Sequence, residues 1–194
     1  MTEKQFGTEI NGSTTVSIGI DQSLTGFALT ILDTDDPTKY RTWVYKSPFK
    51  GVKRLVNISS WLVEKLELVE DRYVVDVAME GTVLASHSAL VLGELAAVVK
   101  IVFWSFFEDY DHQDHLRVPL QIPPMTLKKY AAGKGNAKKQ EMLMQIYKRY
   151  GIEFNDDNAA DSYALARIAA KLHINDVEKQ IIEQIKDPKY RDNL

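Results

Sequence analysis

The chain has 194 residues, 45% of them hydrophobic and 26% charged, with a net charge of −3 at pH 7 and no cysteine. This size and balance are typical of one globular domain, with or without appendages. The lack of cysteine excludes a disulfide framework and thiolate metal sites, so any bound metal would need oxygen or imidazole ligands.

The start of the chain is polar and lacks the apolar core of a signal peptide. The most apolar stretch, 84–107, is interrupted by Glu94 and Lys100. It therefore does not predict a membrane span, and we expect a cytoplasmic protein. We predict three parts: a flexible N-terminus over 1–13, a main domain over 14–174, and a C-terminal helix and tail over 175–194.

Hydrophobic periodicity predicts three strands, followed by helices that alternate with two further strands. Strands are expected at 15–21, 25–33, 40–45, 72–79 and 116–122. Helices are expected at 51–69, 86–107, 124–132, 137–150 with Asn136 as N-cap, 158 or 159 to 172, and 176–186, before a loose tail after Pro188. This order predicts an α/β fold whose mixed sheet has a three-strand antiparallel meander and a parallel pair joined by a βαβ crossover.

The helix over 86–107 is apolar on most sides. Such a helix is either deeply buried or serves as an interface. We regard it as the candidate dimer face.

Carboxylates stand at the ends of two predicted strands: Asp21 after the first and Glu80 after the fourth. A carboxylate beside buried strands is costly unless a cation or a donor compensates it. More polar residues, Asp157, Asn158 and Asp161, begin the last core helix, where positions three and four apart share one face. Alanines in that helix let it lie close to the sheet, which would bring Asp161 towards the strand ends.

Carboxylates gathered this closely repel one another unless cations bridge them. Oxygen ligands without cysteine favour Mg²⁺ or Mn²⁺, and a pair of such ions suits phosphodiester cleavage. Each residue also has an ordinary interpretation: Asp21 as a turn former, Glu80 as a solvent-facing side chain, and Asp157 or Asn158 as a helix cap. Only their order along the chain is specific.

Basic residues dominate the segment 117–150, which holds eight cations and one acid, Glu141. Its net charge of +7 leaves the rest of the chain at about −10. A local basic stripe of this kind suits a polyanion such as DNA, and the alternative is a solvated, lysine-rich helix face.

These motifs resemble those of the RuvC group of Holliday-junction resolvases, in the RNase H-like nuclease superfamily, and more closely its phage-type members. The resemblance spans about Val16 to Leu172. It rests on Ile18-Gly19-Ile20-Asp21 with Thr25-Gly26, on Ala78-Met79-Glu80, on the run from Asp157 to Ala166, and on a lysine segment containing Leu127-Lys128 and Gly133 to Lys139.

The resemblance implies a mixed five-stranded sheet flanked by helices, and symmetric nicking of branched DNA by a homodimer that uses a divalent metal. It implies that Asp21, Glu80 and Asp161 act in catalysis and bind metal, with Asp157 or Asn158 as the fourth ligand. The family's two functional lysines fall on Lys128 and Lys139. We expect Lys139 to act in catalysis and the following residues to contact DNA: Lys128, Lys134, Asn136 and Lys138.

The sequence departs from the family pattern at several points. Asn158 stands where the family has a fourth carboxylate, the link 81–86 is short, and the position of the junction wedge falls near Val83. The helix after Asp176 would be an addition. Three alternatives therefore remain: an RNase H-like nuclease for flaps or RNA–DNA hybrids, a non-catalytic DNA-binding module of the same fold, and a small-molecule protein using Gly133 to Gly135 as a phosphate loop, although that segment misses the P-loop spacing.

Overall fold

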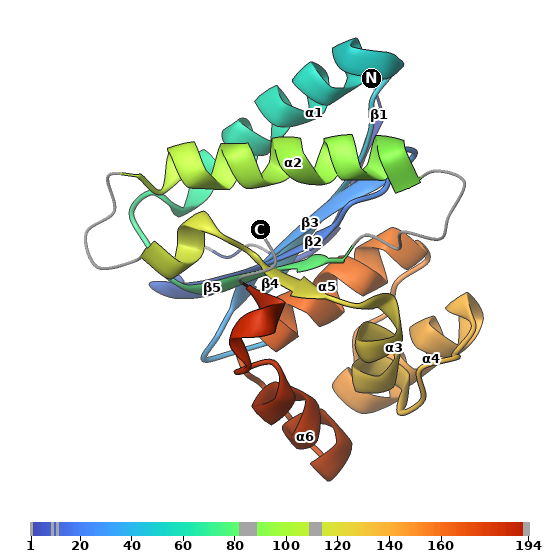
Figure 1. Cartoon of the computed structure of the whole chain (residues 1–194). Helices are drawn as coiled ribbons and strands as arrows, with labels where there is room; N and C mark the ends of the chain where they lie inside the picture. The colour runs from blue at the N-terminus through green and yellow to red at the C-terminus, as the bar shows by residue number, and fades with distance from the viewer. Residues whose placement is uncertain (1, 9, 11, 82–88, 109–113, 192–194) are drawn as a thin grey trace.

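A mixed sheet of six strands runs through the centre of the structure, with helices on both faces (Figure 1). The computed structural model describes residues 2–8, 10, 12–81, 89–108 and 114–191. The strands are β1 (Thr2–Gly7), β2 (Thr15–Asp21), β3 (Phe27–Asp33), β4 (Tyr40–Lys46), β5 (Tyr73–Glu80) and β6 (Leu120–Ile122). The α-helices are α1 (Gly51–Leu66), α2 (Ala89–Phe106), α3 (Pro124–Ala132), α4 (Lys139–Tyr150), α5 (Asp157–Ala169) and α6 (Asp176–Gln184).

The strand order is β1-β4-β3-β2-β5-β6. Antiparallel pairs join β1, β4, β3 and β2, whereas β2, β5 and β6 run parallel. The predicted meander and parallel strands are therefore present. Because β2, β5 and β6 run parallel, all three end at the same edge of the sheet, which we call the carboxyl edge.

The sixth strand, β1, corrects the prediction of five strands and of a flexible start. It pairs with β4 from Thr2 opposite Lys46 to Gly7 opposite Arg41. The side chain of Phe6 packs edge-on against Phe154, with ring centroids 5.8 Å apart. Apart from Phe6, the strand is polar and exposed, so its sequence lacks the alternation by which strands are recognised.

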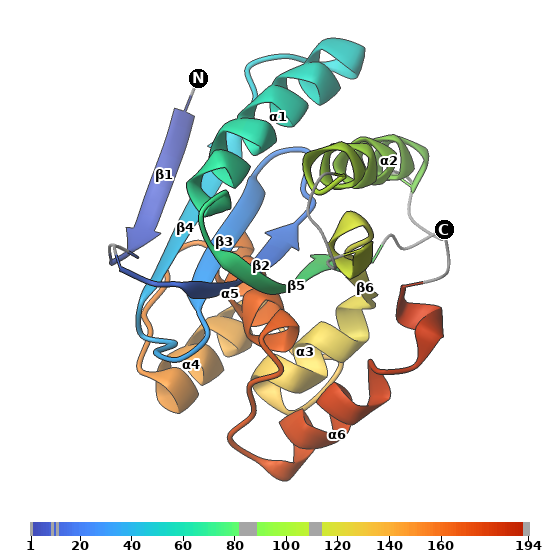
Figure 2. The ribbon, with the colours of Figure 1, turned by 90° about the vertical axis from the view of Figure 1, so that its left-hand side faces the viewer.

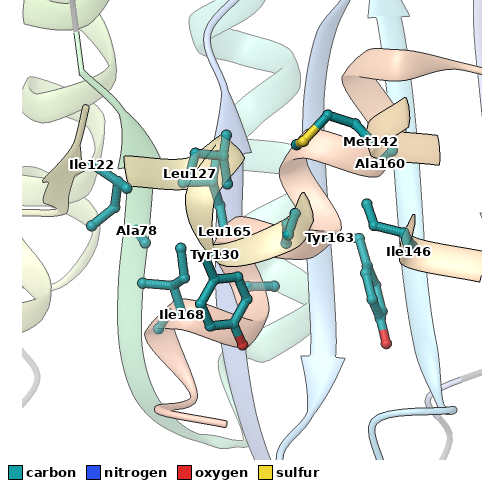
Figure 3. Close-up of a cluster of buried hydrophobic side chains, with 14 of the residues drawn as sticks. Ala78, Ile122, Leu127, Tyr130, Met142, Ile146, Ala160, Tyr163, Leu165 and Ile168 are labelled. Carbon is teal, nitrogen blue, oxygen red and sulfur yellow. The ribbon is translucent and has the colours of Figure 1, made fainter. Parts of the chain in front are cut away.

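Helices α1 and α2 cover one face of the sheet, and α5 covers the other, with α3, α4 and α6 outside it (Figures 1 and 2). Each face has its own buried cluster. Figure 3 shows part of the α5 cluster, in which Leu127 and Tyr130 of α3 and Met142 and Ile146 of α4 lie beside α5. This packing fixes the α3–α4 pair, which carries most of the basic stripe, against the helix that carries Asp161.

Helix α2 combines a buried face with an apolar exposed one. Leu95, Val99 and Phe103 are buried, whereas Leu90, Ile101 and Trp104 are more than half exposed. In length and composition alone, α2 is the one described helix that could cross a membrane. Its buried face packs against α1 and the sheet. The predicted start of this helix at Ser86 lies outside the described residues.

The C-terminal segment is ordered by a buried ion pair, contrary to the expected loose tail. Residues Pro188–Tyr190 form a 3₁₀ helix, and the Arg191 guanidinium donates to both carboxylate oxygens of Asp76 at 2.8 Å. Arg191 also donates to the backbone oxygens of His115 and Val118. Because Asp76 is almost fully buried in β5, its charge requires this partner.

Candidate active site

Asp21 and Glu80 lie side by side because they end neighbouring parallel strands. The register pairs Ile20 of β2 with Met79 of β5, so the next residue of each strand is its carboxylate. Gln22 Nε2 donates to the backbone oxygen of Glu80 at 2.6 Å and so ties the two strand ends together. Asp21 is only 5% exposed, which places a carboxyl group where ionisation is costly.

Helix α5 approaches the sheet closely at Gly19. A β-carbon on Gly19 would lie 2.1 Å from the backbone oxygen of Ser162 and 2.2 Å from the backbone nitrogen of Ala166. Hydroxyl groups bridge the same contact: Ser17 Oγ donates to the backbone oxygen of Ala166 at 2.9 Å, and Thr30 Oγ1 lies 2.8 Å from Ser162 Oγ. No other residue type fits at Gly19 without displacing α5, so this glycine brings Asp161 to the carboxyl edge.

The N-terminus of α5 is set by Asp156. Its side chain accepts a hydrogen bond from the backbone nitrogen of Asn158, as an N-cap does. The predicted caps, Asp157 and Asn158, are therefore wrong, and both residues lie in the first turn of the helix. Asn136 is likewise not the cap of α4: that helix begins at Lys139, and Lys138 precedes it without a side-chain cap.

An open pocket of about 450 Å³ lies at the carboxyl edge. Seven of the predicted site residues line it: Asp21, Glu80, Lys128, Lys139, Asp157, Asn158 and Asp161. The other three, Lys134, Asn136 and Lys138, are exposed outside it, and Lys134 pairs with Glu141 at 2.7 Å. The strands and α5 thus bring the predicted carboxylates together, with two lysines facing them.

Burial raises the pKa values of the three inner carboxyl groups, and the charges of neighbouring carboxylates add to the rise at Asp21 and Asp161. For Asp21, burial is the largest cause of the rise, followed by the charges of Glu80 and Asp161. Burial also raises the pKa of Glu80, and burial with the charges of Glu80 and Asp157 raises the pKa of Asp161 to about 7. A hydrogen bond between Asp21 and Glu80 raises the pKa of Asp21 and lowers that of Glu80.

Lysines oppose this negative charge from the α3–α4 side. Lys139 Nζ forms an ion pair with Asp157; that hydrogen bond and the charges of Asp157, Asp161 and Asp21 raise the pKa of Lys139. The charge of Lys128 acts to lower the pKa values of Glu80 and Asp161. The carboxyl groups nevertheless keep raised pKa values, so the lysines do not neutralise the cluster.

The donor set of this pocket fits a hard divalent cation. Carboxylate oxygens and the Asn158 amide are ligands that Mg²⁺ and Mn²⁺ accept, and a cation would relieve the repulsion that raises the pKa values. Within the described ranges, no three Asp, Glu or His side chains stand ready-made around one metal position. The fit is therefore one of chemistry, and ligation would require the Asp21–Glu80 hydrogen bond to open.

Several pocket residues were missed by sequence reasoning. Ser23, Leu24 and Thr25 line the pocket from the β2–β3 turn, and Leu92 lines it from α2. The turn residues follow Asp21 directly, so proximity in sequence could have suggested them. Leu92 gives no such signal, because its place depends on how α2 packs across the sheet.

The sheet order and the flanking helices match the RNase H-like fold of the RuvC structures. The RuvC structure of Thermus thermophilus is 19% identical in sequence, with a TM-score of 0.60, over 88% of this chain and 96% of that one. The structure of T. thermophilus RuvC in complex with a Holliday junction substrate is 20% identical, with a TM-score of 0.59, over 80% of this chain and 92% of that one. No protein-family profile matches the sequence, and no curated relative is detected from the sequence. The resemblance predicted from the motifs is thus confirmed in the fold.

Proposed function

We propose that this protein is a metal-dependent endonuclease that nicks branched DNA, with the four-way junction as its preferred substrate. The observation that carries the proposal is the cluster of Asp21, Glu80 and Asp161, which line one pocket at the carboxyl edge; their raised pKa values support it, because a cation would offset the cost of ionising them together. Support also comes from the fold, which is shared with a RuvC captured on a Holliday junction. DNA as the substrate accords with the expected cytoplasmic location.

The ligands that we assign to two Mg²⁺ or Mn²⁺ ions are Asp21, Glu80, Asp161 and Asn158. Asn158 is favoured as the fourth because the Asp157 carboxylate is already engaged by Lys139. Bound ions of this kind lower the pKa of a water nucleophile and stabilise the leaving oxygen. Asp157 then serves to hold Lys139 at the pocket, where its ammonium group can neutralise charge that develops on the scissile phosphate.

The basic residues of α3 and the α3–α4 turn supply contacts to the DNA backbone. Lys128 faces the pocket, and Asn136 and Lys138 are exposed beside it. Lys134 contributes less net charge, because Glu141 already pairs with it. Binding carried by such contacts falls steeply with salt, since each neutralised phosphate releases a counterion.

A homodimer would give the two symmetric cuts that a four-way junction requires. The exposed face of α2 carries Leu90, Glu94, Ala97, Ile101 and Trp104, at spacings that alternate four and three residues. This spacing is that of a seam between two packed helices. Because Leu92 of the same helix lines the pocket, such a dimer would set the two pockets at a fixed separation.

The test is cleavage of a labelled four-way junction, a flap and an RNA–DNA hybrid, each with Mg²⁺ and with EDTA. We expect Mg²⁺-dependent nicking of the junction above the other substrates. Asp21→Asn should bind the junction and not cut it, and cutting by that variant would refute the site. Preference for the flap or hybrid would support the alternative nuclease, and binding without nicking at any Mg²⁺ concentration would support a non-catalytic module.

The small-molecule alternative has little support. Gly133 ends α3 in a left-handed conformation, with φ 83°, and the following turn leads directly into α4. A phosphate loop of the P-loop type follows a strand, whereas this one follows a helix.

A further inference from the structure

A second basic patch lies outside the segment 117–150. From Pro37 to Val63 the chain holds six cations and no acid, in a protein of net charge −3. Four of these cations, Lys46, Lys50, Lys53 and Arg54, gather at the end of β4 and the start of α1, and we call them the α1 patch. None of the four forms an ion pair with a carboxylate among the residues that the structure describes.

The strand register places the α1 patch at the carboxyl edge. Asp21 ends β2 opposite Ala28 of β3, and Ala28 is opposite Val44 of β4, two residues before Lys46. Two strand spacings put the end of β4 about 10 Å to the side of Asp21. Figure 1 shows α1 on the face of the sheet away from α3 and α4, so the α1 patch and the basic stripe flank the carboxylates from opposite faces.

Local contacts hold the α1 patch in place. Arg54 Nε donates to the backbone oxygen of Phe49 at 2.9 Å, and Lys53 Nζ lies 4.2 Å from the centroid of the Phe49 ring. The backbone nitrogen of Phe49 donates to Ser47 Oγ. The side chains of Lys46, Lys50 and Lys53 remain exposed, so their charges are open to a ligand.

The position of these cations at a helix N-terminus is unfavourable for helix α1. The N-terminus of a helix carries a partial positive charge that favours acids in the first turn. Helix α1 instead has Lys50 at its N-cap position, no acid in its first turn and no side-chain cap. Like charge is thus concentrated where the fold gains from its opposite, which indicates an anionic partner.

We propose that the α1 patch binds backbone phosphates of the same DNA that enters the carboxylate pocket. The proposal rests on the proposed function for the pocket. It assigns the end of β4 and the start of α1 to a DNA arm, while the α3–α4 side holds the strand at the pocket and the exposed face of α2 stays available for the dimer.

The experiment compares Lys50→Gln/Lys53→Gln with the control Lys39→Gln/Lys179→Gln, which removes the same charge from exposed lysines elsewhere. Labelled four-way junction and linear duplex are titrated in EDTA over a range of KCl, and junction cutting by the wild type in Mg²⁺ is measured in parallel. We expect the patch variant to bind about tenfold more weakly at 150 mM salt, with a log–log salt slope lower by about 1.8. Its melting temperature should equal or exceed that of the wild type.

If the patch and control variants bind DNA with equal affinity and with equal dependence of affinity on salt, the proposal is overturned, whatever the cutting assay gives. Weaker binding with a lowered melting temperature would also overturn it, because the lysines would then act through the fold. Failure of the proposed function gives a different result: the wild type would not cut, while the difference in salt slope between the variants would persist.

Discussion

Neutralising Asp161 should stabilise the metal-free protein while it abolishes cutting. Burial and neighbouring carboxylates raise the pKa of Asp161 from 3.8 to about 7. Between these values the folded protein binds a proton that the unfolded chain has lost, so the free energy of unfolding falls as pH rises. Stability from this group is complete below pH 3.8 and is lost as pH rises to about 7.

The size of the effect follows from the width of this window. About three pKa units at 1.36 kcal/mol each correspond to about 4 kcal/mol at neutral pH. Asp161→Asn removes the ionisable group, so the free energy of unfolding of the variant no longer falls over this pH range on account of residue 161. We therefore expect the variant to be more stable than the wild type by up to about 4 kcal/mol at pH 7.5, and the gain to shrink towards zero near pH 4.

The assay is urea unfolding in EDTA at several pH values, with Asp71→Asn as a control at an exposed acid. Addition of Mg²⁺ should stabilise the wild type and narrow its gap to Asp161→Asn, because the ion binds only the folded state. The reasoning is refuted if Asp161→Asn is no more stable than the wild type at pH 7.5, or if its gain does not depend on pH.

Three further outcomes follow from the packing. Gly19→Ala should lower the free energy of unfolding by more than about 2 kcal/mol in urea titrations, because its β-carbon would meet the α5 backbone; a near-neutral effect would contradict the close approach of that helix. Arg191→Met should cost about 3 kcal/mol by leaving the Asp76 charge buried and unpaired, and Asp76→Asn in the same chain should restore part of the loss. Ile101→Glu, on the exposed face of α2, should give a monomer by sedimentation and a folded protein by circular dichroism. If the variant dimerises at the same protein concentrations as the wild type, the exposed face of α2 is not the interface.

The sequence predicted that Asp21, Glu80 and Asp161 lie together, because short-range signals place each of them, and the structure brings them to one pocket. Asp21 and Glu80 each end an apolar strand, and the order of the elements predicted that these two strands are neighbours in one sheet. The structure pairs them in parallel, so both carboxylates reach one edge. Asp161 could be placed nearby because its helix is rich in alanine. The close contact itself depends on Gly19, which sequence reasoning included in a motif without assigning it this role.

What the sequence did not predict depends on contacts between distant segments. β1 is held by pairing with β4 and by Phe6 on Phe154, neither of which leaves a pattern within residues 2–7. The order of the C-terminal segment comes from Arg191 reaching Asp76, 115 residues away. Asn136 is a good cap by residue type, but the extended backbone of Lys138 moves the start of α4 to Lys139.

The carboxylate pocket and the α1 patch carry opposite charges at the same edge of the sheet, yet they are not paired with each other. If these charges served folding, ion pairs would be the arrangement of lower free energy, as at Arg191 and Asp76. Instead, each set is held apart from its natural partner, the carboxylates by burial and the lysines by exposure at a helix N-terminus. Under the proposed function, a divalent cation would balance the carboxylates and a phosphate backbone would balance the lysines, so that DNA with bound metal would bring both to this edge.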